Sequence, residues 1–353
     1  MKQHSKSQDK KKKVMKLKLK DDGMHYTANK YYSYPAFLAL IDGGRGIGKT
    51  TTFLNMGLRN SLNKNEEFIY LRRYKPEIKK FVNKDSLKPM VDGVRYCGDG
   101  TGGYTAYWED KILGYFISLS TARSYKSVDF SKVTLIIFDE AFVRQTASYR
   151  YLNDEVIQLL EFISTVQRTR TNLRVVLLGN NEDMFSPYHS FFQIPMFEGI
   201  WYDKERAIYC EHAKNSASLI EEEKKTGLWK IIRDTAYGDY HYDNKLLGED
   251  RVNVIDKPES CTLSFRCVIE GQTINFYTFR KDNDVAMYCE YRNKVIDDNI
   301  SYELVNKGKI NYLNVDIFKK RIKAYLYHFY FDNKIYYDNV KGGAIVSWII
   351  ENT

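Results

Sequence analysis

At 353 residues and 43% hydrophobic content, the chain is long enough for two domains, each with its own core. Its five cysteines form no Cys-x-x-Cys pair and its six histidines are scattered, which argues against a zinc or disulfide framework and favours a reducing compartment. The net charge of +9 favours a polyanionic partner, and no apolar run approaches the length of a membrane span. No apolar segment follows the lysines of the N-terminus, so we do not expect a secretory signal there.

Two features precede the first expected strand. Residues 1–22 are a lysine-rich tail, which we expect to be disordered until it meets phosphates or acidic protein surfaces, although a tail without a binding role fits the composition as well. The stretch 25–35 then carries tyrosines at positions 26, 31, 32 and 34. One of these rings could stack on a nucleotide base, but packing in the core is the interpretation that we favour.

The next stretch matches the phosphate-binding pattern Gly-x-x-x-x-Gly-Lys-Thr. An apolar strand is expected before it at 37–41, and a helix after it at 51–62. Glycines let backbone N–H groups approach phosphate oxygens, and the helix start adds a partial positive charge. Lys49 is expected to reach the β- and γ-phosphates, and Thr50 to bind Mg²⁺ through its hydroxyl. A glycine-rich turn with a chance lysine is the alternative. The expected nucleotide-binding residues are Gly43, Gly44, Arg45, Gly46, Ile47, Gly48, Lys49, Thr50 and Thr51.

Residues 67–73 predict a second strand with a basic end, Arg72 to Lys75, at the edge where open α/β sheets bind ligands. Glycine-rich turns and alternating segments between 93 and 121 predict a hairpin and a further strand. The apolar run 133–138 then predicts a central strand that ends in Asp139 and Glu140. In a nucleotide site, Asp139 would hold the Mg²⁺ shell and Glu140 would polarise the attacking water. A buried strand ending in a solvated acidic turn is the alternative.

The spacing of residues 155–166 predicts an amphipathic helix, and 173–178 a buried strand that leads to Asn180. Asn180 could sense the γ-phosphate or orient the attacking water, or it could only close a turn. Arg168 and Arg170 follow the helix. Such arginines can reach the γ-phosphate on a neighbouring subunit, but they also occur in basic surface turns.

Strands that alternate with helices over residues 35–195 predict an α/β fold with a mainly parallel, doubly wound sheet. The wide gap between the two nucleotide motifs leaves room for an extra strand, as in the additional-strand class of P-loop ATPases. Alternating segments from Cys261 to Tyr291 predict an antiparallel meander, followed by helices at 315–330 and 343–350. The domain boundaries that we expect are a tail at 1–22, a P-loop ATPase domain at 23–200, a linker region at 201–258 that is partly helical at 214–233, and a small α+β domain at 259–353.

The residues favour ATP over GTP, because positions 180–183 have the spacing of the guanine-reading Asn-Lys-x-Asp motif but lack its lysine. ATP and Mg²⁺ are therefore the expected cofactors. Two other functions remain open from the residues alone. One is a helicase-like or partition-type DNA-dependent ATPase; the other is a nucleic-acid-binding scaffold with an idle nucleotide site, against which Glu140 argues.

Three motifs together resemble the genome-packaging ATPases of φ29-like small tailed phages. They are the phosphate loop with its internal arginine, the run Arg72-Arg73-Tyr74-Lys75-Pro76-Glu77, and the segment Ile137 to Glu140. The likeness is strong over residues 36–195 and weaker beyond them. It implies an ATP-driven motor that translocates double-stranded DNA into a prohead in the host cytoplasm. It also implies a homo-oligomeric, pentameric ring that contacts portal protein, capsid and a packaging RNA, with no membrane partner.

Carried over by position, the resemblance makes Arg168 a finger that acts in trans. It also makes Lys75, Lys126 and Arg144 candidate contacts to DNA phosphates in the pore of the ring. The second domain resembles a ribonuclease-H-like nuclease that has lost its metal carboxylates. In agreement, the segment 261–269 has no acid at its centre, so we expect no nuclease activity and a domain that is available for RNA or portal docking.

Overall fold

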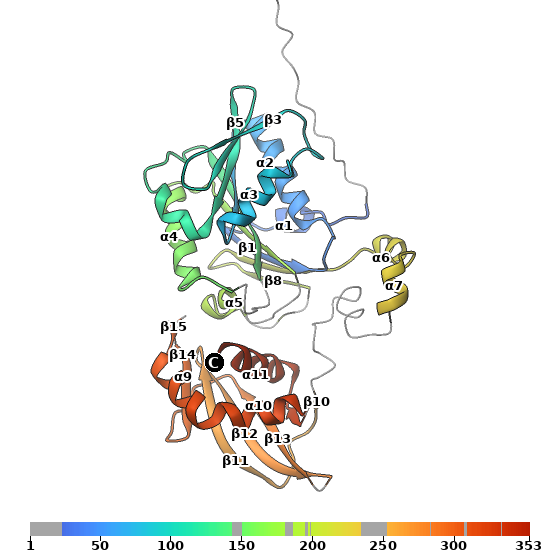
Figure 1. The fold of residues 1–353 in the computed structure, drawn as a ribbon, viewed down its shortest axis with the longest axis vertical. Coiled ribbons are helices and arrows are strands. Elements are labelled where there is room, and N and C mark those ends of the chain that lie inside the picture. Colours follow the sequence, from blue (N-terminus) through green and yellow to red (C-terminus); the bar gives the residue numbers. More distant parts are fainter. Residues whose placement is uncertain are drawn as a thin grey trace, which may run out of the picture.

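The computed structural model describes residues 23–142, 150–180, 186–194, 197, 199–233, 253–282, 284–306, 309–332 and 334–353. These residues form two bodies, each built around its own sheet (Figure 1). Among the described helices, none is long and apolar enough to cross a membrane.

The first body contains a nine-stranded sheet. Six neighbouring strands run parallel, and the pairs β3–β4, β4–β5 and β8–β9 at the two edges are antiparallel. The expected α/β fold with a mainly parallel sheet is therefore confirmed. In spatial order the strands are β3 (Val94–Gly98), β4 (Tyr104–Trp108), β5 (Lys111–Ser118), β2 (Glu67–Arg72), β6 (Val133–Phe142), β7 (Arg174–Gly179), β1 (Leu38–Gly43), β9 (Ile208–Ala213) and β8 (Ile200–Asp203).

Helices cover both faces of this sheet, as the long apolar runs of its central strands require. One core lies under α1 (Asn29–Tyr32), α2 (Lys49–Lys64) and α3 (Lys75–Asn83), and the other lies under the 3₁₀ helix η1 (Leu119–Tyr125) and α4 (Glu155–Gln167). A short helix, α5 (Pro187–Phe191), contacts α4. Because every central strand is buried on both sides, the polar groups of this body gather where the strands end.

One detail extends the sequence expectations and another differs from them. The gap between the two nucleotide motifs contains β2, which lies beside β6 in the sheet. The strand between β6 and β1 is β7, which follows both of them in the chain. Part of the expected linker at 201–258 is sheet: β9 pairs with β1 over six residues, and β8 completes the edge. The helical part of that region is present as α6 (Ala217–Glu223) and α7 (Gly227–Ile232).

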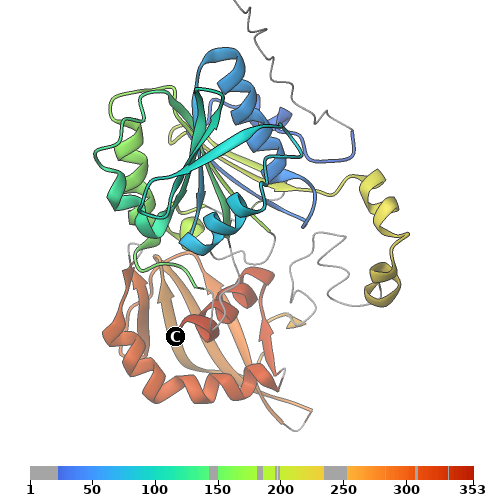
Figure 2. The same ribbon diagram turned by 45° about the horizontal axis from the view of Figure 1, so that its top comes forward.

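The second body is a seven-stranded sheet covered on one face by helices (Figure 2). The expected meander is confirmed by the antiparallel strands β11 (Cys261–Ile269), β12 (Gln272–Lys281) and β13 (Asp284–Arg292). Parallel neighbours make the sheet mixed: β14 (Ser301–Asn306) pairs with β11, and β16 (Ile335–Tyr337) pairs with β13. The short strands β10 (Asn253–Val254) and β15 (Lys309–Ile310) form the edges.

Both helices expected in this body are present. α9 (Tyr312–Phe318) continues through a single π-helical turn, η3 (Lys319–Lys323), into α10 (Ala324–Phe331), and α11 (Val340–Asn352) ends the chain. Together they bury an apolar core on the sheet, with Phe276, Phe318 and Val346 at its centre.

Candidate nucleotide site

The phosphate loop joins β1 to α2, as its motif predicts. At Gly43 the backbone has φ +148°, and a Cβ there would lie 2.3 Å from the carbonyl oxygen of Ala213 on β9. Gly48 precedes the first turn of α2 with φ +91°. Lys49 is folded back onto the loop: its Nζ donates to the carbonyl oxygens of Gly43 and Gly44, at 2.9 and 2.8 Å, and the residue is 7% exposed. These carbonyls hold the ammonium at the loop, where it would meet a phosphate.

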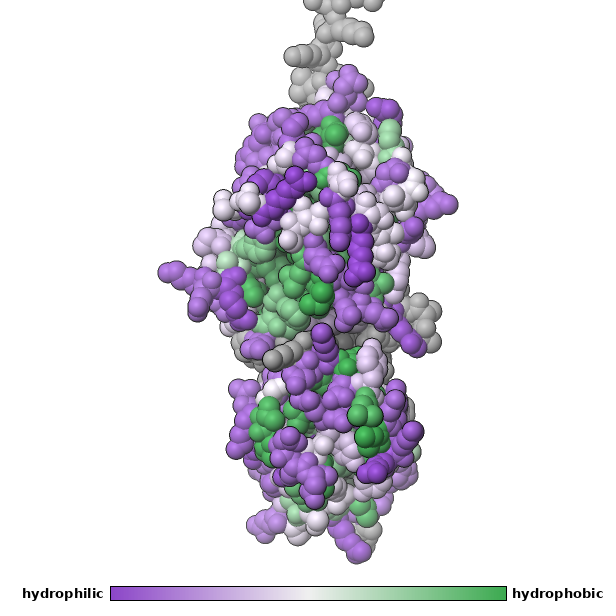
Figure 3. Space-filling model, turned by 90° about the vertical axis from the view of Figure 1, so that its left-hand side faces the viewer, coloured by the Kyte–Doolittle hydropathy of each residue, from purple (hydrophilic) through white to green (hydrophobic). Residues whose placement is uncertain are grey.

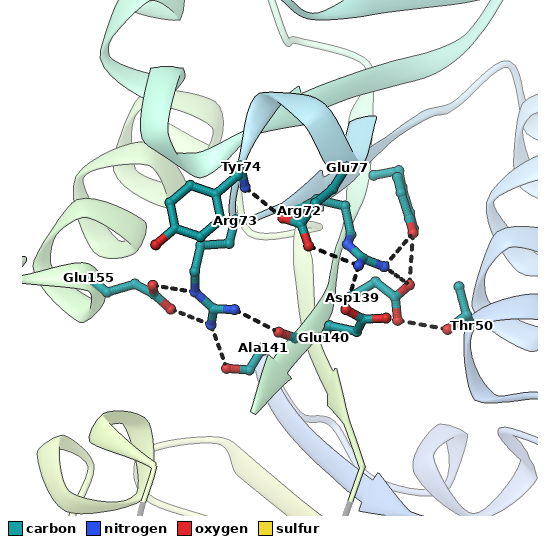
Figure 4. Close-up of polar contacts among 10 residues, drawn as sticks. Thr50, Arg72, Arg73, Tyr74, Glu77, Asp139, Glu140, Ala141 and Glu155 are labelled. Carbon is teal, nitrogen blue, oxygen red and sulfur yellow. Dashed lines mark hydrogen bonds and ion pairs between the residues drawn. The ribbon is translucent and has the colours of Figure 1, made fainter. Parts of the chain in front are cut away.

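The aspartate at the end of β6 lies next to the first turn of α2 (Figure 4). Thr50 Oγ1 donates to Asp139 Oδ1 at 2.7 Å, and Tyr70 on β2 donates its hydroxyl to Oδ2 at the same distance. The pKa of Tyr70 is raised well above its usual value by burial and by the Asp139 charge. Oxygen ligands are those that Mg²⁺ prefers, so the hydroxyl of Thr50 and the carboxylate of Asp139 fit a Mg²⁺ that shares its remaining positions with phosphate and water.

Glu140 follows in a left-handed backbone conformation, with φ +54°. Its carboxylate lies 2.5 Å from Nη2 of Arg72, which also contacts Glu77 at 3.0 Å, while Nη1 donates to Asp139 at 3.0 Å. Burial raises the pKa of Glu140, and the Asp139 and Glu77 charges act in the same direction, whereas the Arg72 charge opposes them. A carboxylate with a raised pKa at the rim of a cleft is suited to accept a proton from water.

The side chains from these elements line one hollow of about 300 Å³ at the carboxyl edge of the sheet. Its walls are the loop from Arg45 to Thr51, the tip of β6 with Asp139 and Glu140, and the end of β7 with Gly179 and Asn180. Lys49 and Glu140 therefore face the same space from two sides. Asn180 is also placed on this wall, as the sequence interpretation required.

A second hollow of about 510 Å³ adjoins the first, because both are lined by Gly46, Gly48 and Thr51. Tyr26 and Tyr32 line it, so two of the four tyrosines before β1 lie where a nucleotide base could extend from the loop. The other two pack in the core: Tyr31 is fully buried, and Tyr34 packs on Tyr202. Tyr26 also donates to the buried carboxylate of Glu211 at 2.9 Å.

The two arginines after α4 lie far from this site and differ from each other. Arg170 is a structural residue: its guanidinium donates to the carbonyl oxygens of Phe130, Ser131, Val133 and Val166. Arg168 is exposed at the C-cap of α4. Hydrogen bonds from Ser131 lower the pKa of Asp129, and the charges of Arg168 and Arg170 add to this effect, which places both arginines near the start of β6. Glu140 lies about 20 Å away at the other end of that strand.

The DNA-contact candidates gather beside a glycine-rich turn at 98–103. Lys75 begins α3 and is exposed, and a Cβ on Gly102 would lie 2.9 Å from its Cδ. The hydroxyl of Tyr125 also contacts this turn, at Asp99 and Thr101, and the exposed Lys126 follows Tyr125 in the chain. The third candidate, Arg144, lies outside the described residues, as do positions 181–183, which follow Asn180 and lack the lysine of the guanine-reading motif.

Sequence reasoning missed several residues of this region. It marked the basic end of β2, but not that Arg72 turns toward Asp139 and Glu140 while Arg73 turns away toward Glu155 (Figure 4). The alternation of a strand could have indicated opposite directions for two consecutive arginines. Nothing in the sequence indicated the partners, which lie 67 to 82 positions away.

Comparisons with known proteins agree with the motifs. A family model described as Podovirus DNA encapsidation protein (Gp16) matches residues 20–300. The DNA packaging protein of Bacillus phage B103 is 31% identical over 253 residues, which are 69% of this chain and 75% of that protein. The DNA packaging protein of Bacillus phage phi29 is 29% identical over 262 residues, or 73% and 76%.

A solved structure shows the same fold. The chain matches one in the bacteriophage Phi-29 viral genome packaging motor assembly with a TM-score of 0.58, covering 93% of this chain and 100% of that one. At 24% identity this likeness concerns the fold alone.

Proposed function

Because the chain belongs to the family of podovirus DNA encapsidation proteins, we propose that it binds ATP beside β1 and uses its hydrolysis to translocate double-stranded DNA into a prohead. One observation carries the proposal: Lys49, Thr50, Asp139 and Glu140 come from two separate motifs and line one hollow. The position of β7 between β1 and β6 supports the additional-strand class of P-loop ATPases.

The residues of the hollow divide the chemistry among them. Lys49 would exchange the carbonyls of Gly43 and Gly44 for the β- and γ-phosphates, and Thr50 and Asp139 would hold Mg²⁺. The bound metal would neutralise charge that develops on the phosphates. Glu140 would take the proton of the attacking water. Arg72 contacts Oε2 of Glu140, and its charge opposes protonation of that carboxylate, so loosening of this contact would make Glu140 a stronger base.

Arg168 is proposed to complete the site of a neighbouring subunit, since it is exposed and lies at the opposite end of β6 from its own site. The face that carries α4 has an apolar area on an otherwise mostly hydrophilic surface (Figure 3), and α4 exposes Ile157 to 40%. An apolar area on the face that carries α4 suits contact with a second copy, as in the homo-oligomeric, pentameric ring that the family resemblance implies.

DNA is proposed to pass along the turn that Lys75 and Lys126 flank, with Arg144 as a further contact. The remaining partners implied by the resemblance are the portal protein, the capsid vertex and a packaging RNA. The second body is proposed to be a domain of the ribonuclease-H-like type without nuclease activity, which docks on RNA or portal. Its β11 carries no carboxylate.

The test of this function is Glu140→Gln in the full-length chain, with ATP turnover measured in the presence and absence of duplex DNA and proheads. The variant should bind ATP and lose hydrolysis, because its amide cannot accept the proton. Normal turnover would refute the assigned role. Mixing Arg168→Ala with Glu140→Gln subunits should restore part of the activity if the arginine acts across subunits, and an absence of rescue would argue against the trans role. Strand separation without packaging would favour a helicase-like enzyme.

A further inference from the structure

The two arginines at the end of β2 hold Glu140 from two sides. Arg72 contacts its carboxylate, and Arg73 contacts its main chain. We propose that Arg73 is a positioning residue for the catalytic glutamate: its guanidinium fixes the backbone of Glu140 and ties it, through Glu155, to helix α4. This inference rests on the proposed role of Glu140 in ATP hydrolysis.

The guanidinium of Arg73 is fully buried, and protein groups surround it. Nη1 donates to the carbonyl oxygen of Glu140 at 3.1 Å, and Nη2 donates to that of Ala141 at 2.9 Å. Nε and Nη2 also form a two-pronged pair with Glu155, at 2.6 and 2.8 Å. The ring of Tyr151 lies 4.8 Å from the guanidinium carbon. Such a planar fork of fixed donors orients what it binds, which a flexible ammonium does not.

The backbone at Glu140 needs an outside donor because it leaves the sheet. The ladder between β2 and β6 ends at the pair Leu71–Phe138, and the ladder between β6 and β7 skips from Phe138 to Phe142. The carbonyls of Glu140 and Ala141 lie within that skipped segment, where φ at Glu140 is +54°. A residue other than glycine adopts this conformation only where its surroundings hold it. Arg73 supplies the donors that a neighbouring strand would have given.

The same contact reaches helix α4. Glu155 is the first residue of α4, and its carboxylate also accepts hydrogen bonds from the backbone of Leu152 at 2.8 Å and from the hydroxyl of Tyr188 at 2.6 Å. α4 then runs for 13 residues, about 20 Å, to Arg168. One buried ion pair thus joins the backbone of the catalytic glutamate to the start of the helix that ends at the exposed arginine.

If Arg73 had only a structural role, replacing it would affect the protein in the same way as replacing Arg170. Both arginines donate to carbonyls of the β6 segment, Arg170 before the strand and at Val133, and Arg73 near its end. Arg170 therefore serves as the matched control. Lysine in either place keeps the charge but cannot reproduce the planar set of contacts, which go to two carbonyls and a carboxylate at Arg73 and to four carbonyls at Arg170.

The experiment compares Arg73→Lys with Arg170→Lys in the full-length chain, well below the unfolding midpoint of each. It measures kcat and KM for ATP, and the Kd of a non-hydrolysed fluorescent ATP analogue. Both variants should lose stability. Arg73→Lys should lose kcat by about 10- to 100-fold with KM and Kd nearly unchanged, because a misplaced base slows the chemical step and not the binding. Arg170→Lys should keep kcat within about twofold.

Equal values of kcat in the two variants, or a fall in kcat that matches a loss of binding-competent protein, would overturn the proposal. If Arg73→Lys does not fold, Tyr188→Phe gives the second test, because it removes one hydrogen bond to Glu155 and leaves Arg73 intact. It should lower kcat by a smaller factor, and an unchanged kcat would also overturn the proposal. Glu140→Gln distinguishes a failure of the proposed function from a failure of the Arg73 proposal. If that variant hydrolyses ATP normally, the proposed function itself fails, and not only the role of Arg73.

Discussion

Arg72 holds together three carboxylates that would otherwise repel one another, and its removal gives the sharpest test of the site's electrostatics. The side chain is 14% exposed and contacts the cluster formed by Glu77, Asp139 and Glu140. Arg72→Gln removes a cation that lies within 3.0 Å of all three, while an amide of moderate size remains in the space. We expect the variant to fold, with reduced stability.

The size of the effect follows from the burial of the cluster. Removing one partner of a fully buried ion pair costs about 3–5 kcal/mol, and an exposed pair contributes about 0–1 kcal/mol. Asp139 is 11% exposed and Glu77 16%, but Glu140 is 48% exposed, so solvent screens part of the repulsion. We therefore expect Arg72→Gln to lower the free energy of unfolding by about 1–3 kcal/mol.

Mg²⁺ should recover part of this loss. With Arg72 absent, the carboxylate of Asp139 and the hydroxyl of Thr50 would be free to share a cation, and a ligand present at about 100 times its Kd stabilises the folded state by about 2.7 kcal/mol. The assay is urea unfolding with and without Mg²⁺, without nucleotide. The control is Arg206→Gln, which removes a more exposed pair with Asp203 and should show neither the loss nor the Mg²⁺ dependence. Equal behaviour of the two variants would refute the reasoning.

Three further predictions concern pH, the phosphate loop and DNA. Burial lowers the pKa of His189 to about 4, so the neutral imidazole should contribute to stability above pH 6.5, and this contribution should be lost as the pH falls toward 4. The free energy of unfolding should fall by about 1–3 kcal/mol over this range because of His189. Unfolding of His189→Gln, measured at a series of acid pH values, should not show this fall. Gly43→Ala should destabilise the chain by about 1–3 kcal/mol more than Gly46→Ala in urea unfolding, because both have positive φ but only Gly43 abuts the carbonyl of Ala213. Lys75→Gln should lower the slope of log affinity against log salt for duplex DNA by about one, and an unchanged slope would remove Lys75 from the DNA path.

The core of the site could be predicted because it depends on local patterns. An apolar strand, a glycine loop and a helix that starts at Lys49 place a phosphate-binding loop wherever they occur. An apolar strand that ends in Asp139 and Glu140 places two acids at a carboxyl edge, and parallel strands share that edge. The sequence was therefore enough to put both motifs on one side of one sheet.

Only the tertiary structure separated residues that look alike in the sequence. Arg72 and Arg73 are neighbours, yet one contacts the carboxylate of Glu140 and the other its backbone. Arg168 and Arg170 are two positions apart, yet Arg170 caps backbone carbonyls and Arg168 is exposed. β9 joined the first sheet although it lies in a stretch that looked like a linker. Local periodicity determines which elements form, but a side chain's partner depends on which distant elements pack beside it, and short-range patterns carry no record of that.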